Sequence, residues 1–440
     1  MTTKRLHRLA FIAVASLALA ACSGSSDSAS SDSTKSTDAT SDTSATSTWV
    51  RTYTGSTADS ASGEPIRIGF ATSSDLLPDG VTAADAAASF INSNAGGVNG
   101  RPIEIVHCNL STPEAGTTCG TQFANDPTIS IAVVGQALFG AADFYKAVDG
   151  KKPVFTASPT GADDFVSDVT TSYTGGALGA SFGIAHFIVN DLAAKNIAVL
   201  ITDDVAGRGG FAAIQPILGM KGAKVTPVFV PPTATAPQVE SALQAVNVTS
   251  VDTLIVGVFE QGCIAAYDAL KDLGVDATKT NVVAVKPCIG PKVQQHMKDL
   301  GETSVVPNGW YFNGFGYNPF TGDASSGFDA VKAILESSGK GELIYTVSTD
   351  EIVSGIVTMV KHLVAAGSDL SLATLETSIK GFTGPAMAIA GPQKCGASPI
   401  FKSICASRVS IDRYLDGTWS TVHGGADSID VSPYLSPAKG

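Results

Sequence analysis

The most constraining feature of this 440-residue chain is its regular alternation of apolar, β-rich runs with longer helix-like segments. The strand-like runs are apolar throughout, which is typical of strands covered on both faces. Strands that alternate with helices favour right-handed crossovers and parallel sheets. The sequence therefore predicts an α/β protein with two groups of strands: Ile66–Thr72, Ile103–Asn109, Ser130–Ala137 and Pro153–Ser158, then Ile197–Asp203, Lys224–Val230, Thr253–Phe259 and Val282–Lys286.

The order of elements changes after Leu300. Three helices follow without strands between them, and the chain ends on a strand-turn-strand unit with Asp416-Gly417 at its turn. Such helices have to cover a sheet that is already formed. We expect the chain to cross between two lobes near Ser172–Thr174, Asn308–Tyr317 and Thr383–Ala390, which would form a hinge.

The N-terminal residues indicate export. Lys4, Arg5 and Arg8 precede a short apolar run, a combination typical of a secretory signal peptide over residues 1–21. The run is too short to span a bilayer, which needs roughly 20 residues. It closes with Leu19-Ala20-Ala21-Cys22, which resembles the lipobox of bacterial lipoproteins. This resemblance implies acylation of Cys22 and a membrane anchor through the N-terminal lipid.

Residues 22–63 are rich in Ser and Thr and poor in apolar side chains. Such a composition buries too little apolar surface to offset the entropy of ordering. We therefore expect a flexible, lipidated linker that holds the folded part away from the membrane.

Charge and cysteine content exclude several classes of partner. The net charge of −12 argues against nucleic acid. Six cysteines remain after Cys22, and an even number in an exported protein indicates disulfides. Many pairings are open to six cysteines, of which we favour the sequence neighbours Cys108–Cys119, Cys263–Cys288 and Cys395–Cys405. No spacing suggests a metal site or a cofactor, and we expect neither.

One segment carries a family resemblance. Residues 91–105, INSNAGGVNGRPIEI, form the end of an amphipathic helix, a Gly-Gly stop and an Asn-Gly turn into a strand. The segment resembles the signature of type I periplasmic binding proteins of the branched-chain amino acid group. This implies two flavodoxin-like, Rossmann-like lobes joined by a multi-strand hinge, with residues 64–173 plus 310–384 in lobe 1 and residues 174–309 plus 385–440 in lobe 2.

In such sheets the ligand lies beyond the carboxyl ends of the strands. The strand ends of the sequence provide the predicted ligand-binding residues. They are Gln136, Ala137, Leu138, Phe139, Ser158, Pro159, Thr160 and Gly161 from the first lobe, and Asp204, Ala206, Phe259, Glu260 and Lys286 from the second.

The resemblance also shows where this sequence departs from amino acid binders. In that group a hydroxyl after the third strand and small residues after the fourth hold the ligand carboxylate, and an acid after the eighth holds the ammonium. The hydroxyl position here is Phe139 and the acid position is Cys288. The class of ligand is therefore open.

The resemblance predicts an extracytoplasmic solute-binding lipoprotein of an ABC-type importer, with a permease and ATPase subunits as partners and no enzymatic activity. The small-molecule ligand would be an amino acid or a related polar metabolite. One alternative is a ligand-sensing module that signals through a separate membrane protein. A second is an extracellular hydrolase, for which the sequence shows no evident cluster of Ser, His and Asp.

Overall fold

The computed structural model describes residues 39–314, 317–323 and 325–436. The predicted signal peptide and Cys22 lie outside the described residues. The first sheet has the order β2-β1-β3-β4-β5 and is parallel throughout. Its strands are β1 (Ile66–Thr72), β2 (Ile103–Asn109), β3 (Ile129–Val134), β4 (Val154–Thr156) and β5 (Thr170–Thr171).

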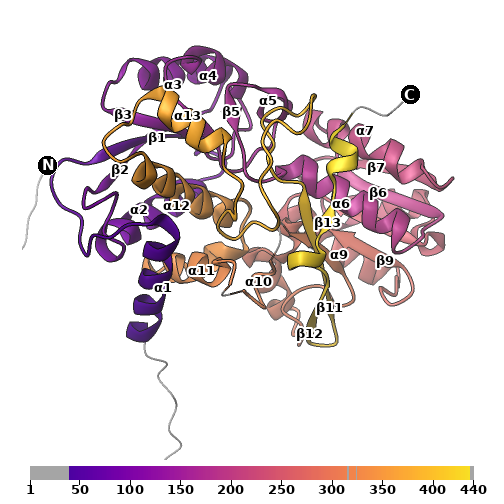
Figure 1. Ribbon diagram of the computed structural model, residues 1–440. Helices are drawn as coiled ribbons and strands as arrows, with labels where there is room; N and C mark the ends of the chain where they lie inside the picture. The colour runs from indigo at the N-terminus through magenta and orange to yellow at the C-terminus, as the bar shows by residue number, and fades with distance from the viewer. Residues whose placement is uncertain (1–38, 315–316, 324, 437–440) are drawn as a thin grey trace, which may run out of the picture. The chain divides into compact units, whose positions relative to one another are not determined.

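Helices cover both faces of the first sheet (Figure 1). One face packs on α2 (Asp79–Asn94), α11 (Phe328–Ser337) and α12 (Thr349–Ala366), the other on α3 (Pro113–Asn125) and α4 (Ala141–Val148). Short α5 (Ala162–Val166) follows β4, and α13 (Leu372–Lys380) contacts α12. Burial on both faces explains why these strands are apolar throughout.

The second sheet has the order β12-β11-β10-β9-β8-β6-β7, and β13 pairs with β11. Its parallel part contains β6 (Asn196–Thr202), β7 (Lys224–Val230), β8 (Thr253–Gly257), β9 (Asn281–Ala284) and β10 (Tyr311–Gly314). The antiparallel strands β11 (Arg408–Leu415), β12 (Thr418–His423) and β13 (Ile429–Asp430) complete it. Helices α6 (Gly176–Asn190) and α7 (Val205–Gly219) cover one face, and α8 (Ala236–Ala245), α9 (Glu260–Asp272) and α10 (Pro291–Asp299) the other.

The predicted fold class is confirmed: the chain has two α/β lobes, and the predicted hairpin is present. Asp416 and Gly417 have φ values of 48° and 81°, as a two-residue hairpin turn with two left-handed positions requires. The chain leaves the first sheet after β5, returns to the first-lobe core after β10, and enters the second sheet again at β11.

Two segments lie in a different lobe from the one that the predicted boundaries gave. Residues 311–314 form β10 between β9 and β11, so they belong to the second sheet rather than to lobe 1. Residues 386–389 pack into the core of the first lobe rather than that of lobe 2. Both segments lie next to crossings, where the lobe is decided by contacts between residues distant in sequence.

The prediction of a flexible linker over residues 22–63 is wrong for residues 39–54. Helix α1 (Ala39–Thr54) is formed there (Figure 1). Val50 of this helix is fully buried in the first-lobe core. Trp49 stacks on Tyr53 and lies against Gly327, where a β-carbon would come within 2.2 Å of the indole ring. A Ser/Thr-rich helix of low propensity is therefore stabilised by docking rather than by its own sequence.

Tyr53 connects α1 to the third crossing. Its hydroxyl lies 3.0 Å from the Thr358 hydroxyl of α12, donates to the Pro385 carbonyl and accepts from the backbone N–H of Met387. Burial raises the pKa of Tyr53 to about 12. Through Tyr53 the helix thus contacts the third crossing between the lobes.

Tyr53→Phe should lower the free energy of unfolding by about 1–3 kcal/mol, because the buried Met387 N–H loses its acceptor. Denaturant unfolding measures this. The exposed Thr48→Ala, on the same helix, should change stability by less than about 0.5 kcal/mol. Equal effects of the two substitutions would contradict the docking of α1 described here.

Candidate functional site

The carboxyl ends of β1, β2 and β3 are held together by two hydroxyls. Thr72 donates to the backbone carbonyl of Gln136, and Ser73 donates to the carbonyl of Leu110. The Ser73 hydroxyl also accepts from the backbone N–H of Leu138 at 2.9 Å. The segment Gln136–Phe139 is therefore fixed against the end of β1.

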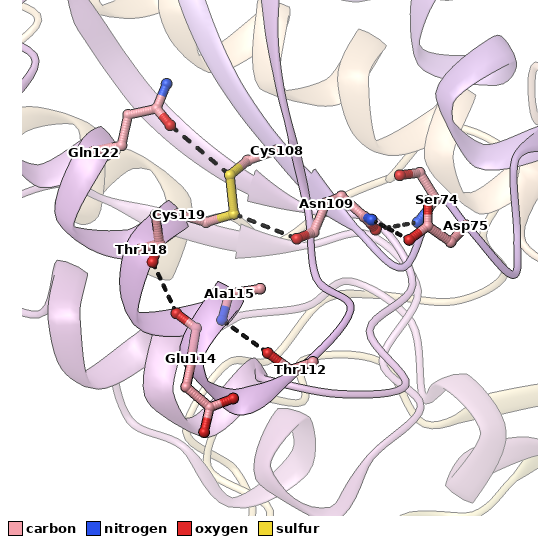
Figure 2. The surroundings of a disulfide bond; sticks show 10 residues. All are labelled: Ser74, Asp75, Cys108, Asn109, Thr112, Glu114, Ala115, Thr118, Cys119 and Gln122. Carbon is pink, nitrogen blue, oxygen red and sulfur yellow. Dashed lines mark hydrogen bonds between the residues drawn. A yellow bond between two sulfur atoms is a disulfide. The ribbon is translucent and has the colours of Figure 1, made fainter.

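A disulfide supports the same end of the sheet. Cys108 of β2 is bonded to Cys119 of α3, and Figure 2 shows Asn109 beside it reaching the turn after β1. The Asn109 side chain accepts from the Ser74 N–H at 3.0 Å and donates to the Asp75 carboxylate at 2.6 Å. The disulfide Cys263–Cys288 links α9 to the segment after β9, and Cys395–Cys405 is also present, so the predicted pairings are confirmed.

The loop after β4 is organised by one buried carboxyl group. Asp164 of α5 accepts from the N–H groups of Thr160 and Gly161, at 2.8 and 2.9 Å, and from the Tyr145 hydroxyl at 2.5 Å. Burial raises the pKa of Asp164, and these donors oppose the rise. The loop Ser158–Gly161 therefore has its shape before any ligand arrives.

On the second lobe, the predicted residues lie at the ends of β6, β8 and β9. Asp204 caps α7 by accepting from the Gly207 N–H at 2.7 Å. Glu260, at the start of α9, accepts from the Lys292 N–H at 2.6 Å. Asp204 therefore caps its own helix, as short polar side chains often do. Glu260 bridges from α9 to the first turn of α10.

The first turn of α12 joins the strand ends of the two sheets. Asp350 forms an ion pair with Lys286, the residue two positions beyond the end of β9, at 2.6 Å. Glu351 accepts from Ser158 at 2.7 Å and from Thr174, at the first crossing, at 3.0 Å. Ser348 donates to the Gln136 side chain at 2.6 Å. One helical turn thus contacts β3, β4, a crossing and the second lobe.

Buried charge is concentrated at this junction. The Lys286 side chain is 10% exposed and that of Asp350 14%, and apart from this ion pair neither Lys286 Nζ nor Asp350 Oδ1 has a hydrogen-bond partner among the described residues. Burial, followed by the negative charge of Asp350, raises the pKa of Glu351 to about 8. Lys286 and the hydroxyls of Ser158 and Thr174 oppose that rise.

The cavities of the structure do not by themselves locate a binding site. The larger one, about 500 Å³, lies at the amino ends of β1 and β3, where Glu64, Arg67 and Ser130 line it. Ligands of parallel sheets bind at the opposite ends. A cavity of about 10 Å³ adjoins the junction and is lined by Lys286, Asp350 and Asp412 among others. It has room for about one water molecule.

The predicted ligand-binding residues differ in their accessibility. Gln136, Ala137, Ser158, Pro159 and Lys286 are buried, whereas Leu138, Thr160, Gly161, Asp204 and Glu260 are half-buried and Phe139, Ala206 and Phe259 are exposed. They lie at neighbouring strand ends of their respective sheets. Whether each touches a ligand stays a prediction.

Sequence reasoning missed the residues that tie these ends together: Ser73, Asp164, Ser348, Asp350 and Glu351. Acids in the first turn of a helix are common because they favour its dipole, so Asp350 and Glu351 gave no distinct signal. Only the paired acids at the start of a long apolar helix, which follows no strand, could have drawn attention to them.

A Gly-x-Ser-x-Gly pattern occurs at Gly179–Gly183, but it lies inside α6. Ser181 donates to the Ala177 carbonyl one turn earlier. A hydrolase nucleophile would need a sharp strand-to-helix turn. The pattern is therefore part of a helix and does not support the hydrolase alternative.

Comparison with known proteins identifies the family. Residues 65–381 match the family model described as periplasmic binding protein. The chain belongs to this family. Its members are solute-binding proteins rather than enzymes, which confirms the predicted type I fold resemblance and the prediction that the chain is not an enzyme. No curated protein matches the sequence significantly.

Solved structures of similar fold include three from bacteria. A putative branched-chain amino acid ABC transporter protein of Rhodospirillum rubrum is 14% identical, with a TM-score of 0.61 over 81% of this periplasmic binding protein and 100% of that chain. A substrate-binding protein of Desulfitobacterium hafniense in complex with Leu is 17% identical and has a TM-score of 0.61. The match covers 82% of this chain and 100% of that chain. A solute-binding protein of R. palustris in complex with 4-hydroxybenzoate is 14% identical and has a TM-score of 0.62. The match covers 83% of this chain and 97% of that chain. Over the described residues, no helix has the length and apolar character needed to cross a membrane.

Replacing Lys286 by Met should destabilise the protein by about 3–5 kcal/mol, because Asp350 would be left as a buried, unpaired charge. The double variant Lys286→Met with Asp350→Leu should recover most of the loss. Denaturant unfolding of a double-mutant cycle measures the coupling. The exposed pair Lys380–Glu376 provides the control, with an expected coupling below about 0.5 kcal/mol. Equal coupling in the two cycles would refute the buried junction.

Glu351→Gln should flatten the pH dependence of stability between about pH 5 and 8. The folded protein keeps the Glu351 proton up to about pH 8, whereas the unfolded chain loses it near 4.5, so wild-type stability is lost as pH rises through this window. Across this pH window the free energy of unfolding of the variant should fall by at least about 1 kcal/mol less than that of the wild type, since each unit of pKa difference corresponds to about 1.4 kcal/mol. Asp412, whose pKa burial raises to about 6, titrates in both proteins and cancels. Parallel pH profiles from urea unfolding would argue against a buried, protonated Glu351.

Proposed function

We propose that the protein is the extracytoplasmic solute-binding lipoprotein of an ABC-type importer. It captures a small metabolite between its lobes by hinge closure and delivers it to a permease driven by ATPase subunits. The family match supports solute binding. The ligand class is left wider than amino acids, because the similar structures include complexes with Leu and with 4-hydroxybenzoate.

The observation that carries the proposal is the junction at the first turn of α12. It brings the ends of β3, β4 and β9 to one place and contacts the first crossing through Thr174. Away from that place, exposed strand-end residues such as Phe139 and Phe259 remain available to a solute. Hinge closure around a ligand requires two lobes that are connected on one side and strand ends that are accessible on the other.

The lipid anchor is part of the proposal. Acylation of Cys22 would tie the chain to the outer face of the cytoplasmic membrane. Mass spectrometry of the mature N-terminus tests the acylation, and Cys22→Ser should release the protein from the membrane fraction.

A solute at 100 times its dissociation constant should raise the free energy of unfolding by about 2.7 kcal/mol. A thermal-shift screen of amino acids, amides, amines, organic acids and aromatic acids measures this, and recovery of the unchanged solute excludes turnover. Uptake of the same solute by cells should require the protein. A broad library without any stabilising compound, or chemical conversion of the bound solute, would overturn the proposal.

A further inference from the structure

The strand ends that would face a solute differ in which chemical groups they leave available. A bound carboxylate needs N–H or O–H donors or a cationic side chain to replace its water. Donors that already serve the chain's own carboxyl groups cannot do so without leaving a buried carboxyl group unpaired. The occupancy of the donors therefore bears on the charge of the ligand.

Three donors after β4 serve the chain's own carboxyl groups, and the Thr160 hydroxyl donates to the Ser158 carbonyl at 3.2 Å. The Ser158 hydroxyl donates to Glu351 at 2.7 Å, and the N–H groups of Thr160 and Gly161 donate to Asp164 at 2.8 and 2.9 Å. Releasing them to a ligand would strand Asp164 or Glu351, which are 0% and 5% exposed. The chain itself thus fills this region with carboxyl groups.

The ends of β1 and β3 show the same occupancy. Leu138 N–H donates to Ser73, Ser73 N–H donates to the Gln136 carbonyl, and Ser74 N–H donates to the Asn109 side chain. These bonds stay within the sheet end. They hold the loops in place and leave these donors without capacity for a ligand anion.

Two cationic side chains at the second-lobe strand ends already have acidic partners. Arg208 pairs with Asp203 at 2.5 Å, and Lys286 pairs with Asp350 at 2.6 Å. Asp75, Asp204 and Glu260 lie at strand ends as well, and within the described part of the chain none of them has a cationic partner. The balance of charge at these ends is negative.

Large apolar side chains are exposed at three of the same ends. Leu76 follows β1 and is 60% exposed, Phe139 follows β3 and is 49% exposed, and Phe259 follows β8 and is 48% exposed. Exposed apolar side chains at loops that are otherwise tightly hydrogen-bonded favour contact with an apolar partner. Aromatic faces also attract cations.

We propose that the solute is an organic amine with an apolar body and no carboxylate. This rests on the proposed function and defines its substrate class. Phe139, Phe259 and Leu76 contact the apolar body, and the second-lobe carboxylates that have no cationic partner among the described residues, Glu260 first among them, attract the ammonium group. The carboxyl groups Asp164 and Glu351 exclude acids by occupying the donors that an acid would need.

Matched sets of compounds test the proposal on the full mature chain. Benzylamine, benzamide and benzoate share one apolar body, and isoamylamine, leucinamide, leucine and isovalerate share another. By calorimetry and thermal shift, we expect the amine of at least one set to bind at least tenfold more tightly than its matched carboxylate compounds. A carboxylate compound that binds as tightly as the amine overturns this inference and leaves solute capture intact. A library without any binder overturns both.

Two variants sharpen the test. Phe259→Ala should weaken binding of the amine about tenfold, whereas Met220→Ala, at an exposed residue after α7, should leave it unchanged. Glu260→Gln retains an acceptor for the Lys292 N–H but removes the charge, and it should weaken amine binding severalfold and reduce its salt dependence. Wild-type affinity and salt dependence in both Phe259→Ala and Glu260→Gln would overturn the assignment.

Discussion

The structure depends on the partners of the buried carboxyl groups at the first turn of α12. Removing a charged or polar group from water is costly unless a partner is provided. Asp350 has Lys286 of the second lobe, and Glu351 has hydroxyls from the end of β4 and from the first crossing. Because these partners come from both lobes, the cost of burial is met only when both sheets meet this helix. A purely apolar contact would specify the relative position of the two sheets less well.

Around this junction the strand ends are prepared in advance. Asp164 shapes the loop after β4, and Ser73 binds the end of β3 to that of β1. Two disulfides brace the end of β2 and the segment after β9. Helix α1 adds a further restraint at the third crossing through Tyr53. A binding surface fixed in this way loses little conformational entropy when a ligand binds.

The sequence was most informative where the signal is local. Apolar runs such as Ile197–Asp203 predicted their strands closely, and the Asp416-Gly417 turn predicted the hairpin, because both follow from backbone geometry. The docking of α1 could not be predicted, since Tyr53, in a Ser/Thr-rich segment, bonds to Thr358, which lies 305 positions further along the chain. The partners of Asp350 and Glu351 were hidden for the same reason. Their effect depends on Lys286 and Ser158, which no local pattern places beside them.

The central claim is that two lobes joined at α12 close on a solute. The most direct measurement is the distance between two spectroscopic probes carried by noncanonical amino acids. These replace the exposed residues Glu114 and Lys292, in the first turns of α3 and α10. Encoding them genetically leaves the disulfides untouched. The account predicts that a saturating solute shortens this distance and narrows its distribution. An unchanged distance distribution with the solute demonstrably bound would contradict it.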